Sequence, residues 1–177
     1  MARPYQPSLL RLLHGATAAL VALAWISGGL IVGTLDRRWG RLPIQLPAAL
    51  EVIDLHGSLG VALTLISFLF VPYALTLGRA RLRRPENGVA LLALLLALVS
   101  GKLMDEDWLR EGQLHHLAYS LHLTAWLVLS LAVVVHLLVL LRRGGPALPL
   151  SMLRLDLKPG DQPRHWPQQL RRFFGFP

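Results

Sequence analysis

The sequence contains no cysteine and is poor in charged residues. Only 16% of its 177 residues are Asp, Glu, Lys or Arg, whereas a soluble domain carries about a quarter. Without cysteine, the chain can form no disulfide, no thiolate metal site and no cysteine-ligated iron–sulfur cluster. Covalent haem attachment through a C-x-x-C-H motif is excluded for the same reason.

Four stretches lack charged side chains altogether, and their lengths predict membrane crossing. They are 24, 24, 15 and 30 residues long and cover residues 12–35, 55–78, 87–101 and 112–141. A helix needs about 20 apolar residues to cross a bilayer. The third stretch is short, but Lys102 can extend its side chain to the headgroups and so lengthen the span. The first stretch is longer than the roughly 7–15 apolar residues of a signal peptide, so we expect a retained helix.

These stretches predict an all-α membrane protein, a four-transmembrane-helix bundle that runs up, down, up and down. We expect spans at about residues 8–35, 49–77, 88–104 and 117–141, within a transmembrane domain covering residues 1–145. A basic, proline-rich tail follows over residues 146–177. Its basic and aromatic end suits the headgroup region of a membrane, and a disordered tail is the alternative.

The basic residues predict the sidedness of the bundle. Of the 18 Lys and Arg residues, 13 lie in the N-terminus, in the loop after the second span and in the tail. The other two loops hold 5 basic and 7 acidic residues. Because Lys and Arg collect on the cytoplasmic face, both termini are expected there. The net charge of +8 thus reflects topology, and no motif indicates a nucleic-acid partner. We expect the cell inner (plasma) membrane, with an internal energy-transducing membrane as the alternative.

Four of the seven histidines fall within the apolar spans. Ionisable residues inside a membrane are costly and usually mark function, although a single one can be a structural hydrogen-bonder. By depth they form two pairs, each drawn from two spans. His14 and His136 lie near the cytoplasmic ends of their spans, and we call them the inner pair. His56 and His122 lie near the opposite ends, and we call them the outer pair.

The two histidines of the fourth span face the same way. His122 and His136 are 14 residues apart, which is about 3.9 helical turns, so their side chains lie within roughly 40° of each other. Their separation along the helix axis is about 21 Å. One face of this span therefore offers a ligand at two levels of the membrane.

Two imidazoles at each level suit two haems stacked across the bilayer. Haem iron takes axial imidazoles on its opposite faces, and helix bundles hold such sites on facing helices. Zinc usually needs three or four protein ligands at one place, and Asp54, the nearest carboxylate to His56, lies roughly 160° round the helix from it. A path for protons or metal ions lined by the histidines remains an alternative.

Cationic residues near each level are candidate partners for the haem propionates. At the inner level these are Arg11, Arg142 and Arg143, and at the outer level Arg37, Arg38, Lys102 and Arg110. Anchoring at the membrane edge is the simpler interpretation of each. His115 and His116 precede the fourth span and could relay protons or hydrogen-bond a haem edge or a quinone. An exposed interfacial pair is the alternative.

The motifs around these histidines resemble those of bacterial cytochrome b561, a group of four-helix b-type cytochromes related to hydrogenase cytochrome b subunits. The resemblance covers about residues 8–143 and rests on three features: Arg11-Leu12-Leu13-His14, Leu55-His56-Gly57-Ser58-Leu59-Gly60, and the spacing of His122 and His136. Gly15 departs from it, because many relatives have tryptophan there.

The resemblance implies two non-covalent haems b. The inner haem would be held by His14 and His136, and the outer haem by His56 and His122. It also implies electron exchange with a quinone such as ubiquinone, in some relatives as a superoxide:quinone or quinol-linked oxidoreductase. A redox protein partner is implied in the alternative role, in which the chain is the haem-bearing membrane anchor of a larger dehydrogenase or hydrogenase.

Overall fold

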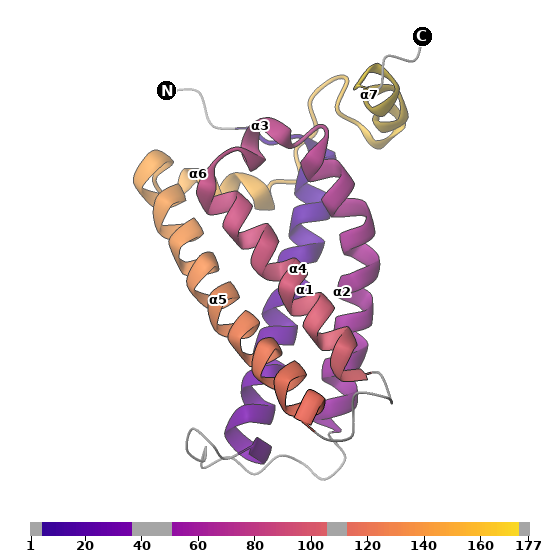
Figure 1. The fold of residues 1–177 in the computed structure, drawn as a ribbon. Coiled ribbons are helices and arrows are strands. Elements are labelled where there is room, and N and C mark those ends of the chain that lie inside the picture. The colour runs from indigo at the N-terminus through magenta and orange to yellow at the C-terminus, as the bar shows by residue number, and fades with distance from the viewer. Residues whose placement is uncertain (1–4, 37–50, 106–112, 174–177) are drawn as a thin grey trace.

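The computed structural model describes residues 5–36, 51–105 and 113–173, and its architecture is four long helices (Figure 1). The long helices are α1 (Ser8–Ile31), α2 (Val52–Leu75), α4 (Pro85–Asp105) and α5 (Gln113–Gly144). A π-helical turn, η1 (Val32–Asp36), continues α1. All four are long and apolar enough to cross a membrane, so the predicted all-α membrane bundle is confirmed.

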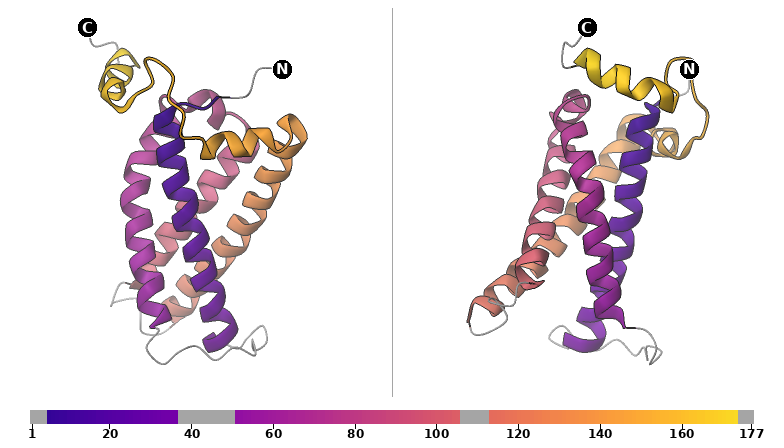
Figure 2. Two further views of the ribbon diagram at one scale, coloured as in Figure 1. Left: turned by 180° about the vertical axis from the view of Figure 1, so that it is seen from behind. Right: turned by 90° about the vertical axis from the view of Figure 1, so that its right-hand side faces the viewer.

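The long helices pack as two hairpins. The first hairpin is α1 with α2 and the second is α4 with α5, and contact within each exceeds contact between them. In the right-hand view of Figure 2, the two hairpins diverge away from the end that carries the termini. Alanines such as Ala93, Ala125 and Ala132 are buried, and such small residues let membrane helices approach closely.

Large apolar side chains cover the outside of the bundle. Phe68, Leu92 and Leu131 are each about two-thirds exposed or more, at 71%, 67% and 66%. In water such a surface would be a strong aggregation site. In a bilayer it meets lipid tails, which explains why these helices are apolar on nearly every side.

One end of the bundle carries both ends of the described chain, together with α3 (Arg79–Leu82) and α6 (Ala147–Leu150) (Figure 1). We call it the terminal end. At this end α5 stops at Gly144, and Gly145 adopts a φ of 59° and donates its N–H to the Leu141 carbonyl at 2.9 Å. Only glycine takes this left-handed conformation without strain, which makes it a common helix terminator. Which side of the membrane the terminal end faces stays a prediction from the basic residues.

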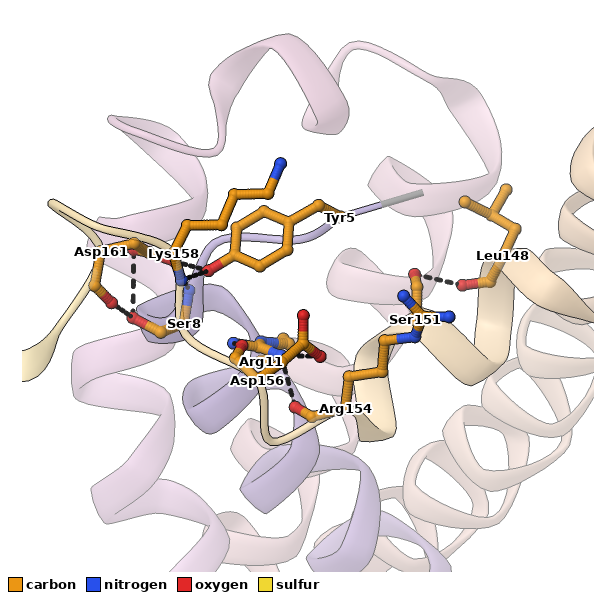
Figure 3. Close-up of polar contacts among 9 residues, drawn as sticks. All are labelled: Tyr5, Ser8, Arg11, Leu148, Ser151, Arg154, Asp156, Lys158 and Asp161. Atoms are coloured by element: carbon orange, nitrogen blue, oxygen red, sulfur yellow. Dashed lines mark hydrogen bonds and ion pairs between the residues drawn. The ribbon is translucent and has the colours of Figure 1, made fainter. Parts of the chain in front are cut away.

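The tail is more helical than its prolines predict. After α6 it forms η3 (Ser151–Leu153), η4 (Pro163–His165) and α7 (Trp166–Phe173). It is tied to the start of α1 through Asp161, whose carboxylate accepts from the Tyr5 hydroxyl at 2.5 Å and from the Ser8 N–H at 2.7 Å (Figure 3). Since α1 has no side-chain cap of its own, this distant carboxylate satisfies one of its free N–H donors.

Asp161 and Tyr5 shift each other's pKa values. Burial alone would raise the pKa of the Asp161 carboxyl, but hydrogen bonds from Tyr5 and Ser8 outweigh it and hold that pKa below its usual range. Burial and the hydrogen bond to Asp161 raise the pKa of the Tyr5 hydroxyl. At neutral pH the carboxylate is therefore charged and the phenol keeps the proton that it donates.

Candidate functional site

The structure brings the four histidines of the spans together in the two predicted pairs. In the inner pair the rings of His14 and His136 have centroids 6.3 Å apart and planes at 31°. In the outer pair the rings of His56 and His122 have centroids 6.0 Å apart and planes at 74°. Each pair takes one ring from the first hairpin and one from the second. Both pairs therefore bridge the two halves of the bundle.

The ring separations fit two imidazoles that share one metal on opposite faces. An imidazole nitrogen binds a metal at about 2 Å and lies about 1.1 Å from its ring centre, so the ring centres should be about 6.2 Å apart. The observed 6.3 and 6.0 Å agree with that value. Among the described residues, no group of three or more His, Cys, Asp or Glu side chains could hold a metal ion. The donor set is thus two neutral imidazoles per level, which suits haem.

The comparisons with known proteins decide the family. The family model of prokaryotic cytochrome b561 matches residues 5–154, which include both histidine pairs. The chain belongs to the prokaryotic cytochrome b561 family. Membership means membrane electron transfer through haem b. Searches of curated proteins and of solved structures found no significant match.

The outer pair of this cytochrome b561 chain has hydrogen-bond partners within the bundle. The Ser27 hydroxyl lies 2.8 Å from Nδ1 of His56, and the Ser100 hydroxyl lies 3.0 Å from Nδ1 of His122. Both serines are almost fully buried. In each ring this leaves Nε2 as the nitrogen available for a metal.

A stacked tryptophan pair lies close to the outer pair. Trp25 and Trp126 have ring centroids 5.5 Å apart and planes at 12°, and Trp126 follows His122 by one helical turn. The Trp25 indole donates to the Ser130 hydroxyl at 2.6 Å. These contacts join α1 to α5, so both tryptophans help to pack the two hairpins together.

The inner pair is surrounded differently. His14 meets the ring of Phe70 edge-on, with centroids 6.2 Å apart and planes at 81°. Nδ1 of His136 is buried and has no hydrogen-bond partner. Such an unsatisfied atom is rare in a native interior. The two levels thus differ in how their rings are held.

Two of the predicted propionate partners already hold other groups. Arg11 is buried, donates to the backbone carbonyls of Arg154 and Asp156, and lies 3.8 Å from the Asp156 carboxylate (Figure 3). Its Nε is buried without a partner. Arg143 forms an ion pair with Glu86 of α4. Both arginines therefore join parts of the chain at the terminal end, whatever else they bind.

The remaining predicted partners are exposed or lie outside the described residues. Arg142 and Lys102 are exposed. Arg37, Arg38 and Arg110 lie outside the described residues. His116 is exposed at the start of α5, and the side chain of His115 is outside the described part of the chain. A role for any of them at a haem stays a prediction.

A shallow pocket of about 320 Å³ opens at the terminal end. Its lining comes from the N-terminal segment, the end of α2, the residues after it, α3 and the tail: Tyr5, Pro7, Tyr73, Leu77, Arg81, Asp161 and Gln169. None of these is a histidine, so the pocket is separate from both pairs.

The hydrogen-bond partners of the outer pair were missed in the sequence. Apolar patterns identify the helices but do not show which residue of one helix meets which residue of the next. The available signal was a repeated dipeptide, because Ser-Gly occurs at Ser27-Gly28 and again at Ser100-Gly101. Both copies lie within predicted spans, on the two helices that carry no outer histidine.

Proposed function

We propose that the chain binds two haems b and carries single electrons between the two sides of the membrane. His14 and His136 would hold the inner haem, and His56 and His122 the outer one. The observation that carries the proposal is the presence of two histidine pairs, each bridging the hairpins with ring centroids about 6 Å apart. The spacing of 14 residues from His122 to His136 corresponds to about 21 Å along the helix axis, most of a hydrocarbon core of about 30 Å.

The protein's part in this function is to hold and insulate the redox groups. Haem b supplies a one-electron couple. Each haem iron would be held by two histidines, which would leave it without a site for an exchangeable ligand. The helices fix the two ring levels relative to each other, and lipid-facing side chains such as Leu65 and Phe68 keep the surroundings apolar. The chain would thereby set the distance between the haems and their midpoint potentials. It would favour electron transfer over the binding of exchangeable ligands at the iron.

A quinone is the proposed exchange partner within the membrane. Quinones dissolve in the hydrocarbon core and couple electron transfer to protonation. The lipid-facing surface of the bundle would let a quinone approach it from within the membrane. If the other partner is a small electron donor at the opposite side of the membrane, the chain would act as a quinone-linked oxidoreductase. Ubiquinone added to the reduced holoprotein, or ubiquinol added to the oxidised holoprotein, should then change its haem spectrum within seconds.

A second candidate function is that of a haem-bearing membrane anchor for a larger dehydrogenase or hydrogenase. The observation that favours it is the basic surface of the terminal end, where Arg79, Arg83 and Arg84 are exposed. Such a surface attracts an acidic partner and speeds its encounter. Copurification of a soluble redox subunit from gently solubilised membranes would support it. A path for protons or metal ions has less support, because each pair matches the spacing for one shared metal and the family binds haem b.

The test of the proposal is the haem content of the purified chain. A reduced-minus-oxidised spectrum and a pyridine haem assay should give two haems b per chain. Replacing His165, which lies in the tail away from both pairs, should leave this number unchanged. One haem or none per chain, in a preparation expressed and purified with haem in excess, would refute the two-haem assignment.

A further inference from the structure

Each ring of the outer pair rests on a Ser-Gly dipeptide of its hairpin partner. His56 on α2 meets Ser27-Gly28 on α1, with 2.8 Å between Nδ1 and the serine Oγ. His122 on α5 meets Ser100-Gly101 on α4, with 3.0 Å between the same atoms. The two hairpins thus use the same dipeptide for the same contact. The serines are 3% and 0% exposed, so water does not compete for the bond.

The serine hydroxyls determine which ring nitrogen carries the proton. Ser27 Oγ lies 3.1 Å from the Ala24 carbonyl, and Ser100 Oγ lies 2.7 Å from the Leu96 carbonyl. A carbonyl oxygen can only accept, so it takes the single hydroxyl proton. The serine oxygen is then left with lone pairs, and Nδ1 of the histidine must donate to it. The opposite nitrogen, Nε2, consequently has a free lone pair for a metal.

The glycines provide the space that brings the rings so close. A Cβ added at Gly28 would lie 3.3 Å from Cε1 of His56, and one added at Gly101 would lie 3.1 Å from Cε1 of His122. Both distances are shorter than ordinary van der Waals contact. Any larger residue would push the ring away by a few tenths of an ångström.

The inner pair has no such support among the described residues. Nδ1 of His136 is buried without a partner, and His14 is contacted by the edge of Phe70. Hydrogen bonding to the second imidazole nitrogen makes the ligand more basic. More basic ligands stabilise the oxidised iron and lower its potential. This difference in hydrogen bonding to the histidines therefore predicts different midpoint potentials for the two haems.

We propose that Ser27-Gly28 and Ser100-Gly101 are positioning residues that fix the tautomer and orientation of the outer histidines and lower the potential of the outer haem. The inference rests on the proposed two-haem function. It assigns the four residues to the outer site alone. Loss of either serine should therefore loosen and shift one haem and leave the other unchanged.

The test places Ser27→Ala or Ser100→Ala in chains that keep one haem each. A His136→Ala chain keeps only the outer haem, and a His122→Ala chain keeps only the inner one. In the His136→Ala chain, each serine substitution should weaken binding of the oxidised haem about tenfold relative to binding of the reduced haem. This change raises the midpoint potential by about 59 mV. In the His122→Ala chain the potential should not move. Thr64→Val is the control, because within the described part of the chain its hydroxyl bonds only to the Gly60 carbonyl of its own helix.

Two further variants separate hydrogen bonding from packing. Ser100→Cys fills nearly the same space with a weak acceptor, so its potential should shift in the same direction as that of Ser100→Ala. Gly101→Ala should reduce outer haem content severalfold, even though alanine favours a helix more than glycine does.

The possible failures are distinguishable. If the His136→Ala chain holds no haem, the proposed function fails and this inference fails with it. If that chain holds one haem and the serine variants leave its potential unchanged, only the positioning role is wrong. An equal shift of the inner haem in the His122→Ala chain would also overturn it, since the effect would then be general.

Discussion

Replacing Asp161 by asparagine should release the tail from the start of α1. The carboxylate accepts from Tyr5 at 2.5 Å and from the Ser8 N–H at 2.7 Å. Hydrogen bonds to a charged acceptor contribute about 1.5–3 kcal/mol and neutral ones about 0.5–1.5 kcal/mol, so each bond loses about 1 kcal/mol. The lost charge at the helix N-terminus adds about 0.3–1 kcal/mol. The docked tail should thus weaken by about 2–3 kcal/mol, or about 30–150-fold in its docking equilibrium.

Hydrogen exchange of the holoprotein in detergent measures this release. Amides from residue 158 to 161, and that of Ser8, should exchange faster in Asp161→Asn. Asp156→Asn is the matched control, because its carboxylate is 60% exposed and lies 3.8 Å from Arg11, where an ion pair contributes about 0–1 kcal/mol. Equal exchange in the two variants would refute the reasoning, since it would mean that the Asp161 bonds do not hold the tail.

The same contact predicts the pH dependence of docking. The pKa of the Asp161 carboxyl is held below its ordinary value in the docked tail. The undocked carboxyl should titrate near the reference value of about 3.9. Docking is therefore at full strength above about pH 5 and weakens as the pH falls through the lowered pKa. Protection factors of the tail amides, which compare each observed exchange rate with the intrinsic rate at the same pH, should fall at acid pH in the native chain and change less in Asp161→Asn.

Three further outcomes are expected. His122→Ala and His136→Ala should each lose one haem of two, and the double variant both, because sites about 21 Å apart act independently; a pyridine haem assay that shows both haems lost in one single variant would contradict this. Ala125→Leu, at a fully buried position of α5, should destabilise the bundle by about 1–3 kcal/mol and lower the thermal midpoint. Arg143→Gln should lower that midpoint further than Glu86→Gln, because it leaves the buried Glu86 carboxylate unpaired, whereas Glu86→Gln leaves an arginine that is half exposed.

The spans and the pairing of the histidines could be predicted from the sequence for simple reasons. Charges are excluded from hydrocarbon, so the charge-free stretches mark α1, α2, α4 and α5 closely. The 14-residue spacing of His122 and His136 fixes their common face through helix geometry alone. Depth then identifies His14 as the counterpart of His136 and His56 as the counterpart of His122, because successive spans run in opposite directions.

Other features depend on contacts between distant segments, which no local pattern encodes. Arg11 was predicted as a propionate partner from its level in the membrane, yet its guanidinium is buried against backbone carbonyls of the tail. That tail was predicted to have little helix because of its prolines, but proline is tolerated in the first turn of a helix, as at Pro163 in η4. Ser27 and Ser100 are unremarkable within their spans until the neighbouring helix is placed.

The division of the bundle into two hairpins gives the cofactors a part in assembly. Each iron would take one ligand from either half, while direct packing between the halves is the lesser share. Under the proposed function, haem supply would then control how tightly the two hairpins assemble. We expect hairpins inserted by a haem-deficient cell to stay loosely associated and open to membrane proteases, and each haem that binds to hold them more firmly together.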